Sequence, residues 1–308
     1  MRLAITGASG FIGRRVAARG LSRGWDVVGL DLDPARDGVR RGDVTDADDA
    51  RRLCEGADVV VHTAAVVRED GDPRVFERVN VGGTANLADA ARAAGVAQLV
   101  HLSSVMVYGF DFPDGVSEEG PYPGLETNPY VVTKLRSEGA ALRAHPDVRV
   151  TVIRPGDVYG RGSVPWVDRP LELMRQGLFA LPDGGRGILN HLHVDNLVDA
   201  VFAAIDREVA GFPINVTDGV RTTCAAYFGA LAGTFDLPPP RTFPGWALRG
   251  AFSALEKGFD LVGAEPPARP AALAYLLRPG VYSIDRARRT LDYAPRVSLD
   301  DGLASLRG

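Results

Sequence analysis

The sequence has little cysteine and no long hydrophobic run. Cys54 and Cys224 are its only cysteines and lie far apart, which excludes a disulfide framework and a cysteine-based metal site. No uninterrupted apolar stretch reaches the roughly 18 residues that a membrane-spanning helix needs. Met1 and Arg2 lead directly into apolar residues, without the charged region and cleavage site of a secretory signal. We therefore expect a cytoplasmic protein without a membrane partner.

An excess of charge of one sign is also absent. The 308 residues include 35 Lys and Arg against 39 Asp and Glu, so the formal net charge is -4 and no positive field would attract nucleic acid. The five histidines are scattered over strand ends, a loop and later segments, so we expect no metal site. These are His62, His101, His145, His191 and His193.

Short β-branched runs alternate with longer helical patterns in the first half of the chain. This alternation predicts an α/β fold with a doubly wound parallel sheet, a Rossmann fold, covered by helices on both faces. The expected strands are Arg2–Thr6, Asp26–Asp31, Val39–Asp43, Val59–His62, Gln98–Ser103 and Arg149–Arg154. The clearest expected helices are Phe11–Arg23, Val75–Ala94 and Asn128–His145.

After Gly160 the regular alternation fades and glycines and prolines become frequent. A helix at His193–Ile205 and a strand at Pro213–Val216 would return the chain to the first lobe. We therefore expect a Rossmann domain of residues 1–160 and about 190–217, interleaved with a smaller, mainly helical substrate lobe of residues 161–189 and 218–308. Amphipathic stretches at Trp246–Val262 and Ala271–Leu277 would either pack this lobe or cover an apolar substrate.

A glycine-rich turn follows the first expected strand directly. Gly7, Gly10 and Gly13 stand at three-residue spacing, and Phe11 and Ile12 open the next helix. Such glycines permit a sharp turn, a close approach of a pyrophosphate to the backbone and tight helix-strand packing. The free N–H groups and dipole of the helix N-terminus favour the anion.

Acidic residues follow the second and third expected strands. Asp31 can accept hydrogen bonds from adenosine ribose hydroxyls and would repel a 2′-phosphate, which favours NAD over NADP. Asp43 and Val44 are placed to meet the adenine, or else belong to a helix N-cap cluster. Arg14, Arg36 and Arg40 could pair with a 2′-phosphate, but arginines beside a cleft are more often solvated.

Tyr130 and Lys134 are four residues apart, hence on one face of the expected helix. A nearby ammonium and a positive nicotinamide would both favour the phenolate, so Tyr130 could take the proton of a secondary alcohol. Ser103 and Ser104 end the fifth strand, where ligands sit in parallel sheets, and either hydroxyl could polarise the substrate oxygen. Asn80 could hold a water or a backbone kink beside them.

Taken together, these motifs resemble the short-chain dehydrogenase/reductase superfamily, in its extended type, the NAD-dependent epimerase/dehydratase group. The resemblance covers nearly the whole chain. In this sequence it is carried by Thr6-Gly7-x-x-Gly10-x-x-Gly13, His62-Thr63-Ala64-Ala65, Asn80, Ser103-Ser104-x-x-Val107-Tyr108-Gly109, Tyr130-x-x-x-Lys134, Arg154-Pro155-Gly156-Asp157-Val158-Tyr159-Gly160 and His193-Val194-Asp195.

The resemblance implies roles for individual residues. The family's catalytic hydroxyl precedes the tyrosine of the V-Y-G segment by four residues, which selects Ser104, together with Tyr130 and Lys134. Lys134 would also anchor the nicotinamide ribose. Pro155 and Val158 would border the nicotinamide, and Ala64, Ala65 and Asn80 would belong to the cofactor site. The family usually dimerises through the helices that Val75–Ala94 and Asn128–His145 resemble, so a homodimer is expected.

Two departures from the family's branches narrow the chemistry. Val105-Met106 replaces the acidic pair of sugar-nucleotide dehydratases, which argues against water elimination. Asp157 replaces the asparagine usual in uridine-diphosphate-sugar enzymes, and a carboxylate is a poor neighbour for a diphosphate. The C-terminal segment from Tyr282 to Leu299 resembles the 3β-hydroxysteroid dehydrogenase and dihydroflavonol reductase branches as much as the sugar branch.

The candidate substrate wall is apolar, which favours a hydrophobic alcohol or ketone. It comprises Val66, Met106, Phe110, Trp166, Phe179 and Trp246. The sequence thus predicts an NAD-dependent oxidoreductase that acts on a secondary alcohol or ketone, of which a hydroxysteroid is one example. The alternatives are a nucleotide-sugar 4-epimerase that keeps NAD bound and a non-catalytic dinucleotide sensor.

Overall fold

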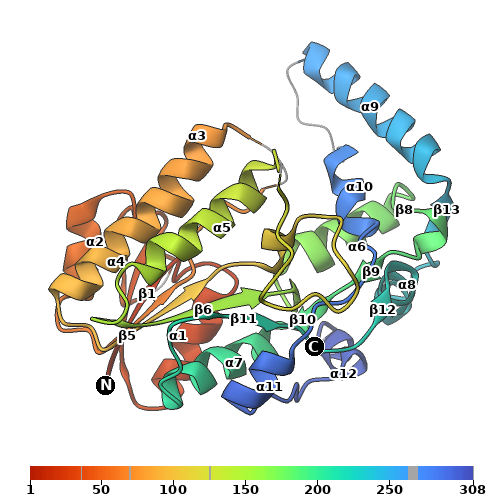
Figure 1. The fold of residues 1–308 in the computed structure, drawn as a ribbon. Helices are drawn as coiled ribbons and strands as arrows, with labels where there is room; N and C mark the ends of the chain where they lie inside the picture. Colours follow the sequence, from red (N-terminus) through yellow and green to blue (C-terminus); the bar gives the residue numbers. More distant parts are fainter. Residues whose placement is uncertain (36, 69–70, 125, 263–269, 308) are drawn as a thin grey trace.

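A computed structural model of the chain describes residues 1–35, 37–68, 71–124, 126–262 and 270–307. A seven-stranded sheet forms its centre, with every neighbouring pair of strands parallel (Figure 1). The strand order is β11-β6-β5-β4-β1-β2-β3. The bounds are β1 Arg2–Thr6, β2 Asp26–Asp31, β3 Val39–Arg41, β4 Val59–His62, β5 Gln98–Leu102, β6 Arg149–Pro155 and β11 Pro213–Val216. The predicted doubly wound sheet is therefore confirmed.

The direction of the strand order reverses between β1 and β4, which lie side by side in the sheet. In open parallel sheets, the carboxyl ends of the strands at such a reversal form a crevice where ligands bind. Gly7, Ala64 and Ser104 all follow strands of this central region. The topology therefore gathers the sequence motifs at one edge of the sheet.

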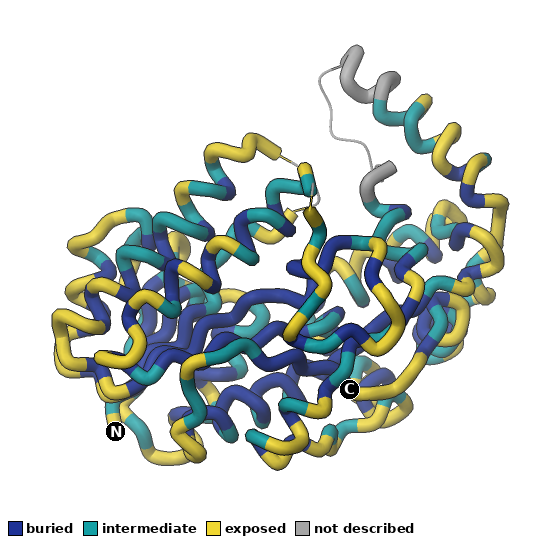
Figure 2. The backbone as a smooth tube through the Cα atoms, in the orientation of Figure 1, coloured by how far each residue is buried: buried dark blue, intermediate teal, exposed yellow. Residues whose placement is uncertain are grey.

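Helices cover both faces of the sheet (Figure 1). On one face lie α1 (Gly13–Ser22), α7 (Val194–Asp206) and α11 (Asp285–Leu291). On the other lie α2 (Ala47–Cys54), α4 (Thr84–Ala93) and α5 (Pro129–Leu142). Figure 2 shows the strands buried between these layers.

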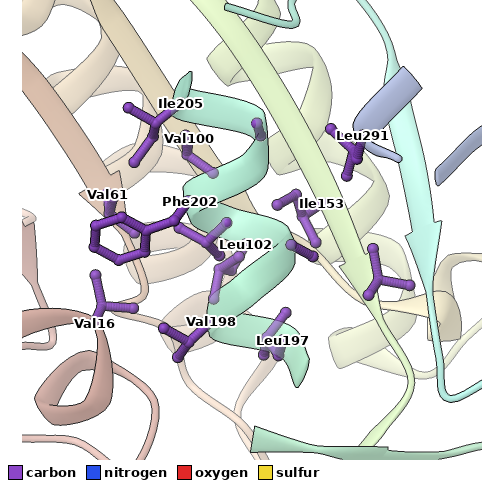
Figure 3. Close-up of a cluster of buried hydrophobic side chains, with 14 of the residues drawn as sticks. Val16, Val61, Val100, Leu102, Ile153, Leu197, Val198, Phe202, Ile205 and Leu291 are labelled. Carbon is purple, nitrogen blue, oxygen red and sulfur yellow. The ribbon is translucent and has the colours of Figure 1, made fainter. Parts of the chain in front are cut away.

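The packing of α7 explains why it was recognisable in the sequence. Its apolar side chains recur at helical spacing and point at the sheet, where Phe202 and Val198 lie against Val61 and Leu102 (Figure 3). His193 caps the helix by accepting a hydrogen bond from the Asp195 N–H at 3.3 Å. The strand β11 then follows α7 and joins the edge of the sheet, as predicted.

The predicted helix at Val75–Ala94 is not a single regular helix. It consists of α3 (Pro73–Phe76), a π-helical segment η1 (Glu77–Gly83) and α4. Apolar periodicity indicates that a helix is present, but it does not show where the hydrogen-bond spacing widens. The π-helical segment carries Asn80, and such segments are frequent at functional sites.

A second group of elements has its own apolar cluster. It includes α6 (Arg169–Arg175), β8 (Ala180–Pro182), β9 (Ile188–Leu189), β12 (Thr222–Thr223), α8 (Cys224–Thr234) and α12 (Leu299–Ala304). Leu171, Leu231 and Leu303 are among its buried members. Further short segments are η2 (Val105–Tyr108), β7 (Asp157–Tyr159), η3 (Val164–Asp168), η4 (Asp183–Gly185) and β10 (His191–His193), of which β7 pairs with β10.

Three elements that follow α8 in the chain also belong to the second group. Figure 1 shows α9 (Gly245–Val262) projecting from the molecule, after β13 (Arg241–Phe243) and before α10 (Pro270–Leu276). Among the described helices, none is long and apolar enough to cross a membrane.

Candidate active site

The glycine turn has the geometry that the sequence predicts for a phosphate-binding turn. Gly7 has φ +64°, and a Cβ there would lie 2.7 Å from Thr63 Oγ1. A Cβ on Gly13 would lie 2.1 Å from the Gly7 carbonyl oxygen, so α1 packs against the turn at van der Waals contact. α1 has neither a side-chain cap nor an acidic residue in its first turn. The N–H groups of Arg14, Arg15 and Val16 bond to the carbonyls of Gly10 and Ile12, whereas that of Gly13 at the helix start would be available to an anion.

Asp31 ends β2 beside this turn and is already hydrogen-bonded. Its carboxylate accepts from the backbone N–H groups of Ser9 at 2.9 Å and of Asp33 at 3.2 Å. These bonds fix the carboxylate next to the glycine turn, where an adenosine ribose would lie in a dinucleotide site. Arg40 is exposed, Arg14 donates to the Arg161 carbonyl at 3.0 Å, and Arg36 lies outside the described residues.

Asp43 and Val44 follow β3 at the same edge of the sheet. Asp43 accepts a hydrogen bond from the Thr45 N–H at 2.8 Å, while Val44 is buried in the core cluster under α2 and α4. The N-cap of α2 is Asp46, which accepts from the N–H groups of Asp48 and Asp49. Asp43 is not the N-cap itself, but its backbone N–H donates to Asp49 Oδ2 in the first turn of α2 at 2.8 Å, so it belongs to the residues that begin this helix and its contact with adenine stays a proposal.

The start of α5 places the proposed catalytic pair. The Asn128 side chain accepts hydrogen bonds from the Tyr130 N–H at 3.0 Å and the Val131 N–H at 3.2 Å, and Pro129 occupies the first turn. Tyr130 thus lies in the first turn and Lys134 one turn later, both buried. The Tyr130 hydroxyl lies near the Ser104 side chain, which lowers the pKa of the phenol. The Lys134 ammonium donates to the Leu102 carbonyl at 2.6 Å.

Burial dominates the electrostatics of this group. It raises the pKa of Tyr130, against the nearby Ser104, which lowers it, and Asp157 raises it further. Burial lowers the pKa of Lys134 to about 8, against the carboxylate of Glu138, which raises it. The Lys134 ammonium bonds to the Leu102 carbonyl and does not lower the pKa of Tyr130 in the protein without cofactor. The expectation that neighbouring cations favour the phenolate therefore requires the positive nicotinamide.

The two serines after β5 have different partners. Ser103 Oγ donates to Glu138 Oε1 at 2.5 Å, and Glu138 is in turn held by Arg154. Ser104 Oγ accepts from the Met106 N–H at 3.1 Å and also meets Tyr130. Ser104 is thus the hydroxyl that lies at Tyr130, whereas Ser103 belongs to a buried ion pair.

Asn80 fixes the loop after β4 rather than standing free in the site. Its carbonyl oxygen accepts from the Val66 N–H at 2.8 Å, and its amide donates to Thr133 Oγ1 at 3.1 Å. These bonds connect the π-helical segment η1, the loop and α5. Of the two sequence interpretations, the geometry favours the structural kink beside the site.

Part of the predicted apolar wall surrounds Tyr130. Met106, Phe76 and Val131 form a buried cluster with it, and Val66, Phe110 and Tyr275 pack against that cluster. Phe179 does not join them, because its ring packs at a tilt against Phe228, at 4.8 Å between centroids, in the second apolar cluster. Trp246 is 80% exposed. Sequence hydrophobicity alone could not separate wall residues from core and surface residues.

A buried residue beside this cluster, Arg278, is not among those that the sequence predicted for the site. Arg278 follows α10 and forms an ion pair with Asp157 of β7, and both side chains are almost fully buried. Its Nη1 also lies 3.7 Å from the Met106 sulfur, and Trp166 is within 6.0 Å of the guanidinium. No sequence pattern signalled this contact, because the two residues are 121 positions apart.

The residues present fit a dinucleotide. The space opposite Gly7 and Gly13 is too narrow for any Cβ, and the uncapped start of α1 faces the same turn as the Asp31 carboxylate. The glycine turn and the start of α1 would hold a pyrophosphate, and the Asp31 carboxylate would hold a ribose.

The comparisons with known proteins agree with this geometry. Residues 3–217 match the model of the NAD dependent epimerase/dehydratase family. A 4-hydroxy-2-methyl-3-oxo-4-farnesyl-3,4-dihydroquinoline-1-oxide ketoreductase from Stigmatella aurantiaca is 29% identical, over 100% of this chain and 96% of its own. A UDP-glucose 4-epimerase from Mycolicibacterium smegmatis is 31% identical, over 99% and 96%.

A solved structure, MoeE5 in complex with UDP-glucuronic acid and NAD, superposes with a TM-score of 0.78 at 25% identity, covering 99% of this chain and 96% of that one. The family model, the relatives and the fold all point the same way. The resemblance found in the sequence is confirmed: this chain is an enzyme of the NAD-dependent epimerase/dehydratase family, the extended short-chain dehydrogenase/reductases.

Proposed function

We propose that this enzyme interconverts a secondary alcohol and a ketone on an apolar substrate, with NAD as the redox partner. The observation that carries the proposal is the burial of Tyr130, Ser104 and Lys134 together, with Tyr130 in an apolar cluster that includes Met106. A hydroxysteroid-like alcohol is one substrate of this class. The Stigmatella relative, named as a ketoreductase of a farnesyl-bearing dihydroquinoline oxide, supports an apolar ketone.

The residues divide the work of proton transfer. Tyr130 takes the proton of the alcohol hydroxyl, or returns it to the ketone oxygen, and Ser104 holds that oxygen by a second hydrogen bond. Lys134, whose pKa is about 8, stays largely protonated below that pH. Beside the positive nicotinamide ring, its ammonium would favour the Tyr130 phenolate. When bound, NAD accepts the hydride of the alcohol carbon, and its reduced form returns one to the ketone.

The second candidate is a nucleotide-sugar 4-epimerase, which the M. smegmatis relative represents. It would use the same proton transfer but retain the cofactor and return hydride to the opposite face of the carbon. Stoichiometry separates the two functions. Net NADH formation with steroids or aromatic alcohols supports the first, and sugar-nucleotide conversion without net NADH supports the second.

The role of Tyr130 is tested by Tyr130→Phe, which removes the hydroxyl and keeps the ring. We expect turnover to be lost by at least 100-fold while NAD still binds, because proton transfer is worth 10² to 10⁴ in rate. Ser104→Ala should lower kcat by a smaller factor. A Tyr130→Phe enzyme with unchanged turnover would contradict the assigned role, and a wild type without any turnover would favour a dinucleotide sensor.

Three further features belong to the proposal. The chain divides into a Rossmann domain of residues 1–160 and about 190–217 and a substrate lobe formed by the remainder, of which α11 packs back onto the sheet. The outer side of α4 and α5 forms the interface of a homodimer. Light scattering tests this, because it measures the mass of the protein in solution.

The enzyme acts in the cytoplasm. Fractionation of cells tests this location.

A further inference from the structure

Asp157 and Arg278 form a buried ion pair between two distant parts of the chain. Asp157 begins β7, directly after the end of β6, whereas Arg278 follows α10. The relative exposure is 6% for the Asp157 side chain and 0% for that of Arg278. The Arg278 Nη2 donates to Asp157 Oδ2, and the same oxygen accepts from the Asn190 N–H at 2.9 Å. One oxygen of the carboxylate thus accepts from both distant parts of the chain.

The guanidinium is held on its other sides by neutral groups. Its Nε donates to the Tyr275 carbonyl at 3.0 Å, and its Nη1 lies 3.7 Å from the Met106 sulfur. The aromatic rings of Trp166 and Tyr275 lie about 6 Å from its central carbon. Asp157 is thus the carboxylate that balances the charge of Arg278 at this place.

The pair adjoins the proposed reaction centre. Met106 touches Arg278 and also belongs to the apolar cluster around Tyr130. The charge of Asp157 is close enough to raise the pKa of the Tyr130 hydroxyl. The pair therefore lies directly behind Met106, one wall of the proposed reaction centre.

We infer that the Asp157–Arg278 pair is a specificity determinant that makes the site accept uncharged ketones and alcohols and reject anionic ones. This inference rests on the proposed function, because it names the substrate class of the same site. An unpaired buried arginine would attract a carboxylate or phosphate, since buried charges require a partner. With Asp157 in place the partner is already supplied, and an arriving anion would meet a carboxylate.

The test uses enzyme saturated with NAD, so that the glycine turn is occupied. Asp157→Asn keeps the shape of the side chain and leaves Arg278 without its counter-charge. The double variant Asp157→Asn/Arg278→Met removes both charges, and it serves as the reference if the single variant is poorly stable. Asp114→Asn is the matched control, because Asp114 forms an exposed ion pair with Arg221 between distant segments.

The first measurement is thermal unfolding in inorganic phosphate and in chloride at equal ionic strength. Phosphate should raise the Tm of Asp157→Asn by several degrees relative to chloride, because a phosphate replaces the missing carboxylate. The wild type, the double variant and Asp114→Asn should show no such difference. An Asp157→Asn protein that responds like the double variant would overturn the inference.

The second measurement is the calorimetric Kd of two ketones that differ in charge, 4-acetylbenzoate and its methyl ester. With oxidised NAD neither can be reduced, so the result is independent of turnover. Wild type should bind the ester more tightly, and Asp157→Asn should shift the ratio at least tenfold towards the carboxylate. An unchanged ratio, or no binding of either ketone by any variant, overturns the inference, while the dehydrogenase assay with Tyr130→Phe is unaffected.

Discussion

Glu138 and Arg154 form a buried ion pair immediately behind the proposed catalytic lysine. The guanidinium donates from Nε to Glu138 Oε1 at 2.8 Å and from Nη2 to Oε2 at 2.7 Å. Glu138 follows Lys134 by one helical turn, and its carboxylate raises the pKa of the lysine against the opposing effect of burial. The pair therefore links α5 to β6 and also helps to keep the ammonium charged.

Glu138→Gln should separate these two roles. The amide keeps the shape but loses the charge, so the pKa of Lys134 should fall below its present value of about 8. The alkaline limit of kcat/KM should then move down by about one pH unit. The variant should also lose about 3–5 kcal/mol of stability, because Arg154 is left buried without its counter-charge.

The pH profile distinguishes a positioning role from a merely structural one. Glu77→Gln is the matched control, because Glu77 pairs with Arg136 at 2.9 Å on the exposed side of the same helix pair. This control should leave the alkaline limit of kcat/KM unchanged. It should alter the free energy of unfolding by no more than about 0.5 kcal/mol. An unmoved alkaline limit in Glu138→Gln would show that Glu138 acts on folding alone.

Two buried histidines should make the fold sensitive to acid. Burial, with a smaller contribution from the charge of Lys134, lowers the pKa of His62 to about 3 and that of His101 well below its usual value. In the unfolded chain both titrate near 6.5, so between these values the unfolded state binds more protons. Their stabilising contribution is thus present above pH 6.5 and is lost as the pH falls towards 3.

His62→Gln should make the acid dependence of stability less steep. Around pH 5 each such histidine contributes up to about 1.4 kcal/mol per pH unit to the slope of the unfolding free energy. Urea denaturation between pH 4.5 and 7.5 should therefore give a smaller slope for the variant. His145→Gln, at an exposed position, is the control and should leave the slope unchanged. Equal slopes for wild type and His62→Gln would contradict the role of the buried ring.

Local patterns in the sequence predicted the parts of the site that lie close together in the chain. Tyr130 and Lys134 could be placed on one helix face by spacing alone, and the V-Y-G resemblance selected Ser104. Likewise, continuous apolar runs such as Val59–His62 predicted strands buried on both faces, since such strands show no alternation. In each case, the information lay within a few residues.

Contacts between distant segments could not be predicted in the same way. Arg278 and Asp157 are 121 positions apart, and the charge of an arginine does not indicate which carboxylate it meets. Phe179 looked like a wall residue because hydrophobicity is the same for a pocket and a core. The π-helical segment at Asn80 depends on side-chain bonds to Val66 and Thr133, which no period in the sequence reveals.

Gly13→Ala should damage the cofactor site and the fold together. The new methyl group would lie 2.1 Å from the Gly7 carbonyl oxygen, so the turn and α1 must move apart. We expect a loss of about 1–3 kcal/mol of stability and at least a tenfold weaker Kd for NAD, measured by urea denaturation and calorimetry. In Gly229→Ala, the control, a Cβ meets nothing within 4 Å in α8. Gly229→Ala should gain about 0.5–1 kcal/mol of stability and should bind NAD with unchanged Kd. Equal NAD affinities in the two variants would argue against the turn as the pyrophosphate site.

Asp31→Asn should relax the preference for NAD over NADP. The amide oxygen can still accept from the Ser9 N–H, which the carboxylate now bonds at 2.9 Å, so the turn should keep its shape. The negative charge that would repel a 2′-phosphate is lost, and the ratio of kcat/KM for NADP to that for NAD should rise at least tenfold. Asp33→Asn removes an equal charge two residues further on, from a side chain that is 93% exposed, and should leave the ratio unchanged. If both variants raised the ratio equally, the preference would come from the net charge of the loop and not from a contact of Asp31 with the ribose.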